Sequence, residues 1–167
     1  LSHDHYQGGR HIFPIQKAKV LYAFPLAQED TLVELVKWPL STIRLTSASK
    51  EALIRLSCRI LDCWRSYDAP AYNIFSHTGT TPHNTITPIA RRVGQKYQID
   101  LVLRNNRTDE TYPDGIFHPH PSLHHIKKEN IGLIEVMGLA ILPARLKEEL
   151  SQLGNCLLGR ADIDAYP

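Results

Sequence analysis

Cysteines are few in this sequence, and no long apolar run is present. The three cysteines, Cys58, Cys63 and Cys156, form no CxxC pair and leave an odd thiol in any disulfide scheme. No apolar stretch reaches the roughly 18 residues that a membrane span needs, and no secretory signal pattern is visible. We therefore expect a protein of the reducing cytoplasm with no membrane partner.

A large excess of charge is lacking as well. The 19 Lys and Arg residues and the 17 Asp and Glu residues give a formal net charge of +2, which is too small to indicate a nucleic-acid partner. An anionic ligand must therefore be small and locally held. The length of 167 residues and the hydrophobic content of 43% suit one globular domain with a real core, without internal repeats or low-complexity tracts.

Two kinds of periodicity alternate along the chain. Residues 11–26 and two short segments within 33–45 mix β-branched and aromatic residues and predict strands. Apolar residues then recur every three or four positions, which predicts a helix with its N-cap at Ser49 and its end near Tyr67. Further strands are predicted at 72–75, 85–89 and 97–104, a loop at 105–115, and helices at 126–142 and 145–158, the last with Pro143 at its first position. This order indicates an α+β domain with a largely antiparallel sheet.

The first nine residues carry the densest chemistry. His3, His5 and Gln7 stand at alternate positions, so a strand would project them from one face, and Gly8 and Gly9 would let the backbone approach a bulky anion. A neutral imidazole can attack phosphorus and form a covalent intermediate. A glutamine amide can donate to a phosphate oxygen, but it can neither protonate a leaving group nor activate water. The row therefore favours group transfer over hydrolysis.

The position of this row adds a second expectation. The chain starts with Leu1 rather than Met and opens directly on the row, so we expect a piece of a longer protein. Taken alone, a His-x-His pair near a terminus is more often incidental or a pair of metal ligands. A non-enzymatic, histidine-rich metal-binding domain is therefore an alternative.

Several segments together resemble a known enzyme family. The segment His3-Asp4-His5-Tyr6-Gln7 is similar to the His-x-His-x-Gln motif of galactose-1-phosphate uridylyltransferases, a branch of the histidine-triad superfamily. The similarity to the second class of these enzymes, found mainly in Gram-positive bacteria, rests on longer segments that cover most of the chain: SHDHYQGGRHIFPIQKA, TPHNTITPIARR, YQIDLVLRNNRTDE and GIFHPHPSLHHIKKENIGLIEVMGLAILPARL.

The resemblance implies a ping-pong reaction in galactose metabolism. UDP-glucose would uridylylate a histidine, glucose 1-phosphate would leave, and galactose 1-phosphate would take the uridylyl group to give UDP-galactose. Carried onto this sequence, His5 is the nucleophile, Gln7 contacts the transferred phosphoryl group and His3 orients the site. Asp4 departs from the first class, which has proline there. The enzymatic alternative is another nucleotidyltransferase or phosphorylase of the same superfamily.

The resemblance also implies an organisation for the chain. Residues 1–30 would end a first histidine-triad-like unit that bears the nucleophile motif, and residues 31–167 would form a second such unit. The N-terminal half of the same polypeptide, with much of the uridine pocket, would be missing from this chain. The family further suggests a homodimer.

A second histidine cluster lies between residues 118 and 125. Its density suggests a metal, and in the first enzyme class histidines of the second half of the protein help to bind a structural metal. If the strand YQIDLVLR instead matches the metal-binding strand of that class, the ligand positions hold Asp100 and Val102, and the site is broken. We favour the alternative in which His118 and His120 line the hexose-phosphate pocket, and we assign no metal or other cofactor. Lys127 or Lys128 would then lie near the phosphate.

Four further polar residues are candidate substrate contacts. His83 lies in a polar turn from which it can face the sugar phosphate. Guanidinium groups pair bidentately with phosphate, which makes Arg91 and Arg104 candidate phosphate ligands. Asn105 follows Arg104 as a candidate ligand for a hydroxyl group. The alternative for each of these residues is an ordinary place on the surface or in the packing.

Overall fold

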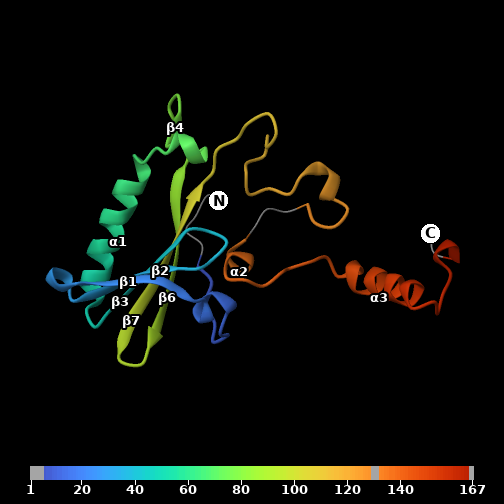
Figure 1. The fold of residues 1–167 in the computed structure, drawn as a ribbon, viewed down its shortest axis with the longest axis horizontal. Coiled ribbons are helices and arrows are strands. Elements are labelled where there is room, and N and C mark those ends of the chain that lie inside the picture. Colours follow the sequence, from blue (N-terminus) through green and yellow to red (C-terminus); the bar gives the residue numbers. More distant parts are fainter. Residues whose placement is uncertain (1–5, 129–131, 166–167) are drawn as a thin grey trace.

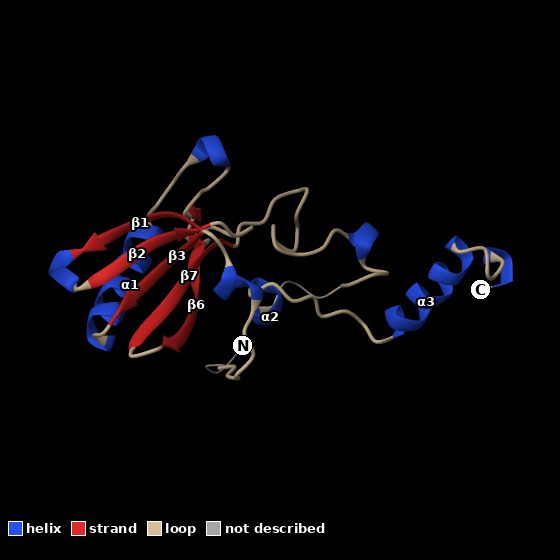
Figure 2. Ribbon diagram, turned by 60° about the horizontal axis from the view of Figure 1, so that its bottom comes forward, coloured by secondary structure: helices blue, strands red, loops and turns tan. Residues whose placement is uncertain are grey.

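The computed structural model of the chain describes residues 6–128 and 132–165. A five-stranded antiparallel sheet dominates it, in the order β1-β2-β3-β7-β6 (Figure 2). The five strands are β1 (Val20–Leu26), β2 (Thr31–Val36), β3 (Thr42–Ser47), β6 (Asn84–Val93) and β7 (Lys96–Asn105). A small separate pair is formed by β4 (His77–Thr78) and β5 (Thr81–Pro82). The α+β class with an antiparallel sheet is thus confirmed.

One face of the sheet is covered by helix α1 (Lys50–Arg65). Its N-cap is Ser49, whose side chain accepts a hydrogen bond from the Ala52 N–H at 3.1 Å, as the sequence predicted. Side chains that alternate along the strands meet the apolar stripe of α1 on this face. The buried core there consists of Val33, Leu45, Leu53, Leu56 and Leu101.

The opposite face carries a second apolar core and two short elements. These are a 3-10 turn, η1 (Pro14–Lys17), and a single helical turn, α2 (Leu133–Val136). The Ile15 N–H donates to the Met137 carbonyl at 3.2 Å, and the Trp38 indole donates to the Val136 carbonyl at 2.9 Å. These bonds hold η1 and α2 together on the sheet. The buried residues of this second core are Ile15, Val102, Val136 and Met137.

The last helix, α3 (Arg145–Leu157), lies away from the sheet at the end of an extended connection (Figure 1). Four further 3-10 turns complete the described elements: η2 (Ala27–Glu29), η3 (Pro70–Tyr72), η4 (Pro121–Leu123) and η5 (Ile163–Ala165). No helix in residues 6–128 or 132–165 is long and apolar enough to cross a membrane.

The structure corrects several of the predicted elements. Of the helix predicted at 126–142, the described part contains only the four residues of α2, because Gly138 adopts φ +100° and ends it. The strand predicted at 11–26 begins only at Val20, since Pro14 opens η1 instead. The segment 72–75 forms no strand but a single bridge between Ala69 and Ile74. Helix α3 has Ala144 at its N-cap, so the predicted place of Pro143 inside the helix was wrong.

The predicted boundary between residues 30 and 31 falls in the tight turn that joins β1 to β2. Asp30 adopts a left-handed conformation there, with φ 45°, and the two strands pair in register from Leu26 and Thr31 onward. Residues on both sides of the boundary therefore contribute strands to one sheet. The assignment of the two sides to separate histidine-triad-like units stays a prediction.

Gly138→Ala should destabilise the face that carries η1 and α2. A Cβ at this position would lie 2.8 Å from Trp38 Cη2 and 2.9 Å from Pro14 Cβ, on a backbone with φ +100°. The strained backbone and the overpacking each cost about 1–3 kcal/mol, so we expect a loss of at least about 2 kcal/mol in urea denaturation. Gly154→Ala is the matched control, because it lies inside α3 with open space around its Cβ. The control should be neutral or stabilising by up to about 1 kcal/mol, and equal losses in both variants would contradict the prediction.

Candidate active site

A cavity of about 580 Å³ opens between the N-terminal segment, strand β6 and helix α2. Gln7 of the His-x-His-x-Gln row lines it, whereas His3 and His5 lie outside the described residues. Tyr6 and Gln7 are not part of a strand, so the predicted extension of a strand through the row fails at these two positions. The lining residues are Gln7, Gly8, Gly9, Arg10, His11, Phe13, Gln16, Pro88, Ile89, Ala90, Arg91, Leu133, Ile134 and Met137.

One lining residue of the cavity, Arg91, belongs to a buried ion network. Asp100 of β7 is fully buried, and its Oδ1 accepts from Arg44 Nε at 2.6 Å. Its Oδ2 accepts from Arg44 Nη2 at 3.0 Å and from Arg91 Nη2 at 2.6 Å. Arg44 lies on β3 directly opposite Asp100, and Arg91 lies on β6. Three neighbouring strands thus place two guanidinium groups around one carboxylate.

This network has two positive charges against one negative charge. Arg91 is also the member that lines the cavity, and its Nη1 is buried without a hydrogen-bond partner among the described residues. A buried donor without an acceptor costs about 1–3 kcal/mol, and more when it is charged. An anion in the cavity would lie next to Arg91 and supply the missing charge. The cavity is therefore suited to a phosphate group.

Three of the predicted substrate ligands lie outside this cavity. His83 is buried, and its Nε2 lies 2.8 Å from Thr78 Oγ1. The Asn105 amide donates to the Phe75 carbonyl at 2.8 Å and to Asn84 Oδ1 at 2.6 Å. The Arg104 guanidinium lies 4.8 Å from the ring centre of Phe117, and burial lowers the pKa of Arg104. These contacts give the three residues packing roles in the described structure.

The other four predicted ligands lie on the connection after β7. His118 and His120 line a small crevice together, where the His120 ring lies 4.8 Å from that of Tyr112. Lys127 Nζ donates to Glu135 Oε1 at 2.6 Å and to the Ile141 carbonyl at 2.9 Å, so two of its three donors are engaged. Lys128 is exposed. None of the four lines the cavity that contains Gln7 and Arg91.

Asp100 and Val102 do not form a metal site on strand β7. Both oxygens of Asp100 accept from guanidinium groups, and Val102 offers no ligand atom. Across residues 6–128 and 132–165, no group of three His, Cys, Asp or Glu side chains could hold a metal ion. No metal is therefore assigned to strand β7.

Low pH should destabilise α2, because the Glu135 carboxylate becomes protonated. Partial burial opposes the ionisation of Glu135, but the hydrogen bond and the charge of Lys127, together with hydrogen bonds from the Glu135 and Gly132 backbone N–H groups, outweigh it, so the pKa lies below its ordinary 4.5. An acid whose pKa is lowered by folding stabilises the protein above its unfolded pKa and loses that effect as the pH falls through the folded pKa. The difference in unfolding free energy between the parent protein and Glu135→Gln should be constant near neutral pH and shrink below pH 4.5. Denaturation series at several pH values would measure it, and a difference that grows in acid would contradict the assignment.

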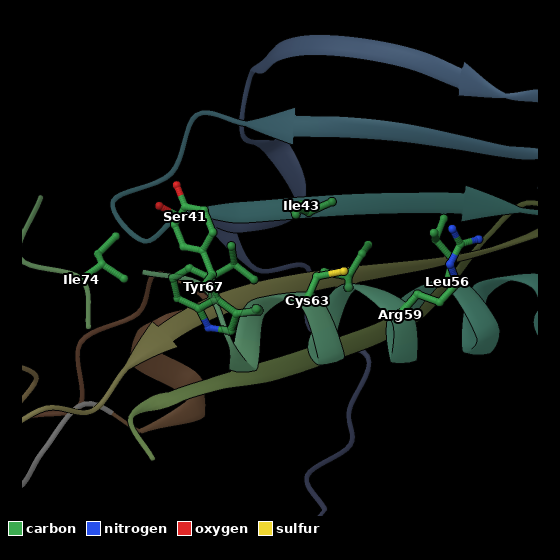
Figure 3. A pocket seen from close by; sticks show the side chains of 10 residues that line it. Ser41, Ile43, Leu56, Arg59, Cys63, Tyr67 and Ile74 are labelled. Atoms are coloured by element: carbon green, nitrogen blue, oxygen red, sulfur yellow. The ribbon is translucent and has the colours of Figure 1, made fainter. Parts of the chain in front are cut away.

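A second cavity, of about 560 Å³, lies on the other face of the sheet between α1 and strands β3 and β7 (Figure 3). Its wall is mostly apolar, and Arg59 of α1 is its charged member. Ile43 of β3 and Leu103 of β7 line this cavity. Successive side chains of a strand point to opposite faces, so their neighbours Arg44 and Val102 lie on the α2 face. This cavity offers no cluster of acid, base and nucleophile and is separated by the sheet from Gln7 and Arg91.

Two charged residues of the site were missed by the sequence analysis. Arg44 was not considered, and Asp100 was considered only as a residue that breaks a metal site. Each stands between two apolar neighbours of its strand, in TIRLTS and in YQIDLVLR. A lone charge within an apolar strand is a usable signal, since charged residues are almost never fully buried unless paired. The pairing itself depends on the register of β3 against β7.

Comparison with known proteins gives a consistent result. The family model described as "Galactose-1-phosphate uridyl transferase, C-terminal domain" matches residues 1–161. The chain is 60% identical over 159 residues, 95% of its length, to a protein named galactose-1-phosphate uridylyltransferase from Clostridium acetobutylicum. It is 58% identical over 162 residues, 96% of its length, to galactose-1-phosphate uridylyltransferase 2 of Streptococcus pneumoniae serotype 4. The matched parts are 32% and 33% of these relatives, so the chain spans about a third of their length. A search of solved structures finds no significant match.

Proposed function

The chain belongs to the galactose-1-phosphate uridyl transferase family, in which it matches the C-terminal domain, and we propose from this that the complete protein is a hexose-1-phosphate uridylyltransferase. It would transfer a uridylyl group between UDP-glucose and galactose 1-phosphate. The names of the relatives from Clostridium acetobutylicum and Streptococcus pneumoniae support this substrate class.

The proposed reaction has two half-reactions at one histidine. A ring nitrogen of neutral His5 attacks the α-phosphorus of UDP-glucose, the bond from that phosphorus to the bridging oxygen breaks, and glucose 1-phosphate leaves with the electron pair. The phosphate oxygen of galactose 1-phosphate then attacks the same phosphorus, the bond to His5 breaks, and UDP-galactose leaves. His3 orients His5, and the Gln7 amide donates to an oxygen of the transferred group.

The observation that carries this proposal is the pairing of Gln7 with Arg91 in one cavity. The two side chains come from segments that are far apart in the sequence, and both line the same space. Arg91 supplies an unpartnered N–H within a network that has surplus positive charge. An amide side chain and a guanidinium side chain that line one cavity suit a phosphoryl group, which offers several acceptor oxygens.

Mass spectrometry of the intact, complete protein tests the proposal. After mixing with UDP-glucose alone, the protein should gain one uridylyl group and release one equivalent of glucose 1-phosphate. Addition of galactose 1-phosphate should remove the group and yield UDP-galactose. Turnover without any covalent adduct would overturn the two-step mechanism, and the absence of both adduct and turnover would overturn the proposed function.

Other parts of the proposal rest on the family alone. We propose a homodimer in the cytoplasm, and roles in substrate binding for His118, His120 and Lys128. A role for Lys127 would require it to leave Glu135 and the Ile141 carbonyl when the substrate binds. Three predicted ligands do not line the cavity with Gln7: His83, Arg104 and Asn105. Their role in substrate binding would be to support the loop that follows β7.

A further inference from the structure

The ion network beneath the cavity reaches further than its three charged members. On one side, Arg91 Nε donates to Gln98 Oε1 at 2.8 Å, and Gln98 Nε2 donates to Thr46 Oγ1 at 3.0 Å. Arg91 is therefore held at two of its three nitrogens, by Gln98 and by Asp100. Such a held guanidinium cannot turn, so Arg91 has a fixed orientation where its side chain lines the cavity.

On the other side, Arg44 connects the network to the N-terminal segment. Its Nη2 donates to the Ile15 carbonyl at 2.8 Å. The Ile15 N–H in turn donates to the Met137 carbonyl at 3.2 Å, and the Ile15 side chain is fully buried. Ile15 is thus held through both of its backbone groups. Because Ile15 lies in the same segment as Gln7, these bonds fix the base from which the His-x-His-x-Gln row extends.

The energetics argue against a network that serves stability alone. Removing two guanidinium groups and a carboxylate from water costs several kcal/mol per ion, and apolar residues of similar volume often stabilise a core equally well. Arg44 is 6% exposed and Asp100 is 0% exposed, so water screens this pair little. The network also carries more positive than negative charge, which raises its cost unless an anion balances it.

We propose that Arg44 and Asp100 are positioning residues, which hold the Arg91 guanidinium and the segment bearing Gln7 in the relative placement that a substrate phosphate requires. This inference rests on the proposed function, since it takes the anion to be a phosphate-bearing substrate. Arg91 contacts the phosphate directly, whereas Arg44 acts through Asp100 on one side and through Ile15 on the other.

Kinetics of Arg44→Lys in the complete protein provide the first test. Lysine keeps the charge, but its single ammonium on a flexible stem cannot reproduce a planar fork that reaches both Asp100 and Ile15. We expect kcat/KM for galactose 1-phosphate to fall about 10–100-fold, the scale of a small misplacement of binding groups. The matched control is Arg55→Lys, whose surface pair with Glu29 lies on the α1 side, and it should change kcat/KM less than twofold. A lower melting temperature with unchanged kcat and KM in the folded protein would make Arg44 merely structural and overturn the proposal.

Binding of inorganic phosphate provides the second test and does not depend on turnover. Calorimetry should show that the complete protein binds phosphate, and that Arg44→Lys and Arg91→Lys each weaken binding about tenfold or more while Arg55→Lys does not. If the protein transfers no uridylyl group but phosphate binding responds in this way, the proposed function fails and the positioning role stands. If transfer is normal, and neither phosphate binding nor kcat/KM responds to Arg44→Lys, the positioning role fails and the proposed function stands.

Discussion

His5→Ala should abolish uridylyl transfer in the complete protein. If His5 carries the uridylyl group, alanine removes the atom that attacks phosphorus, and Gln7 of the same row cannot replace it because an amide is not a nucleophile at phosphorus. Loss of a nucleophile in covalent enzymes lowers kcat by about 10⁴–10⁶-fold. Steady-state assays with UDP-glucose and galactose 1-phosphate, together with the mass of the protein after mixing with UDP-glucose alone, would measure both the turnover and the adduct.

His77→Ala is the control for this substitution. His77 is an exposed histidine of β4, and its Nδ1 lies 3.1 Å from Ser76 Oγ, away from the cavity that Gln7 lines. It should leave kcat and adduct formation within about twofold of the parent protein, the range usual for surface positions away from the chemistry. A uridylyl adduct that persists in His5→Ala would assign the nucleophile to another residue.

Asp100→Ala should destabilise the sheet more than any other single change discussed. The substitution leaves Arg44 and Arg91 buried side by side without their carboxylate, and breaking a buried pair by removing one partner costs about 3–5 kcal/mol. The loss of three hydrogen bonds, at 2.6, 3.0 and 2.6 Å, contributes to this cost. Urea denaturation of the complete protein, followed by a probe within the sheet, would measure it.

Asp62→Ala offers a comparison with an exposed pair. Asp62 lies on α1 and pairs with Arg65 at 3.5 Å, with side chains that are 72% and 62% exposed. Exposed pairs contribute between about 0 and 1 kcal/mol, so this variant should be close to neutral. If Asp100→Ala were as mild as Asp62→Ala, the two guanidinium groups would be hydrated in solution, and the buried network described for β3, β7 and β6 would be wrong.

The elements that could be predicted from the sequence are those with a local cause. Helix α1 shows an apolar stripe and a capping serine, and β6 and β7 form a hairpin whose turn contains Gly94 at φ +59°. The helix predicted at 126–142 was largely wrong, because the apolar residues of this segment do not indicate which of them are buried. Val136 and Met137 are buried, whereas Leu139, Ile141 and Leu142 are exposed, and the backbone at Gly138 interrupts the helix. Tertiary contacts with Trp38 and Pro14 decide this conformation, and no local pattern contains them.

The candidate site could be predicted only in part for the same reason. A short motif identified Gln7, and the affinity of guanidinium for phosphate identified Arg91. The partners of Arg91 were not recognisable, because Arg44 and Asp100 are 56 residues apart and meet only through strand register. His83 and Asn105 illustrate the converse error, since polar residues near a turn satisfy buried backbone and side-chain groups as often as they bind substrate.

The buried network also bears on the order in which the molecule folds. Asp100 gains Arg91 as a counter-charge when β7 pairs with β6, but it gains Arg44 only when β7 has paired with β3. The pairing of β3 with β7 requires the chain between them to close into a long loop. Closing such loops precedes the gain from the contacts, so these pairings form slowly compared with α1. A partly folded chain can therefore contain the helix and the β6–β7 hairpin but not the complete network of Arg44, Asp100 and Arg91. Affinity for phosphate should appear only together with the complete sheet, which links ligand binding to global rather than local opening of the fold.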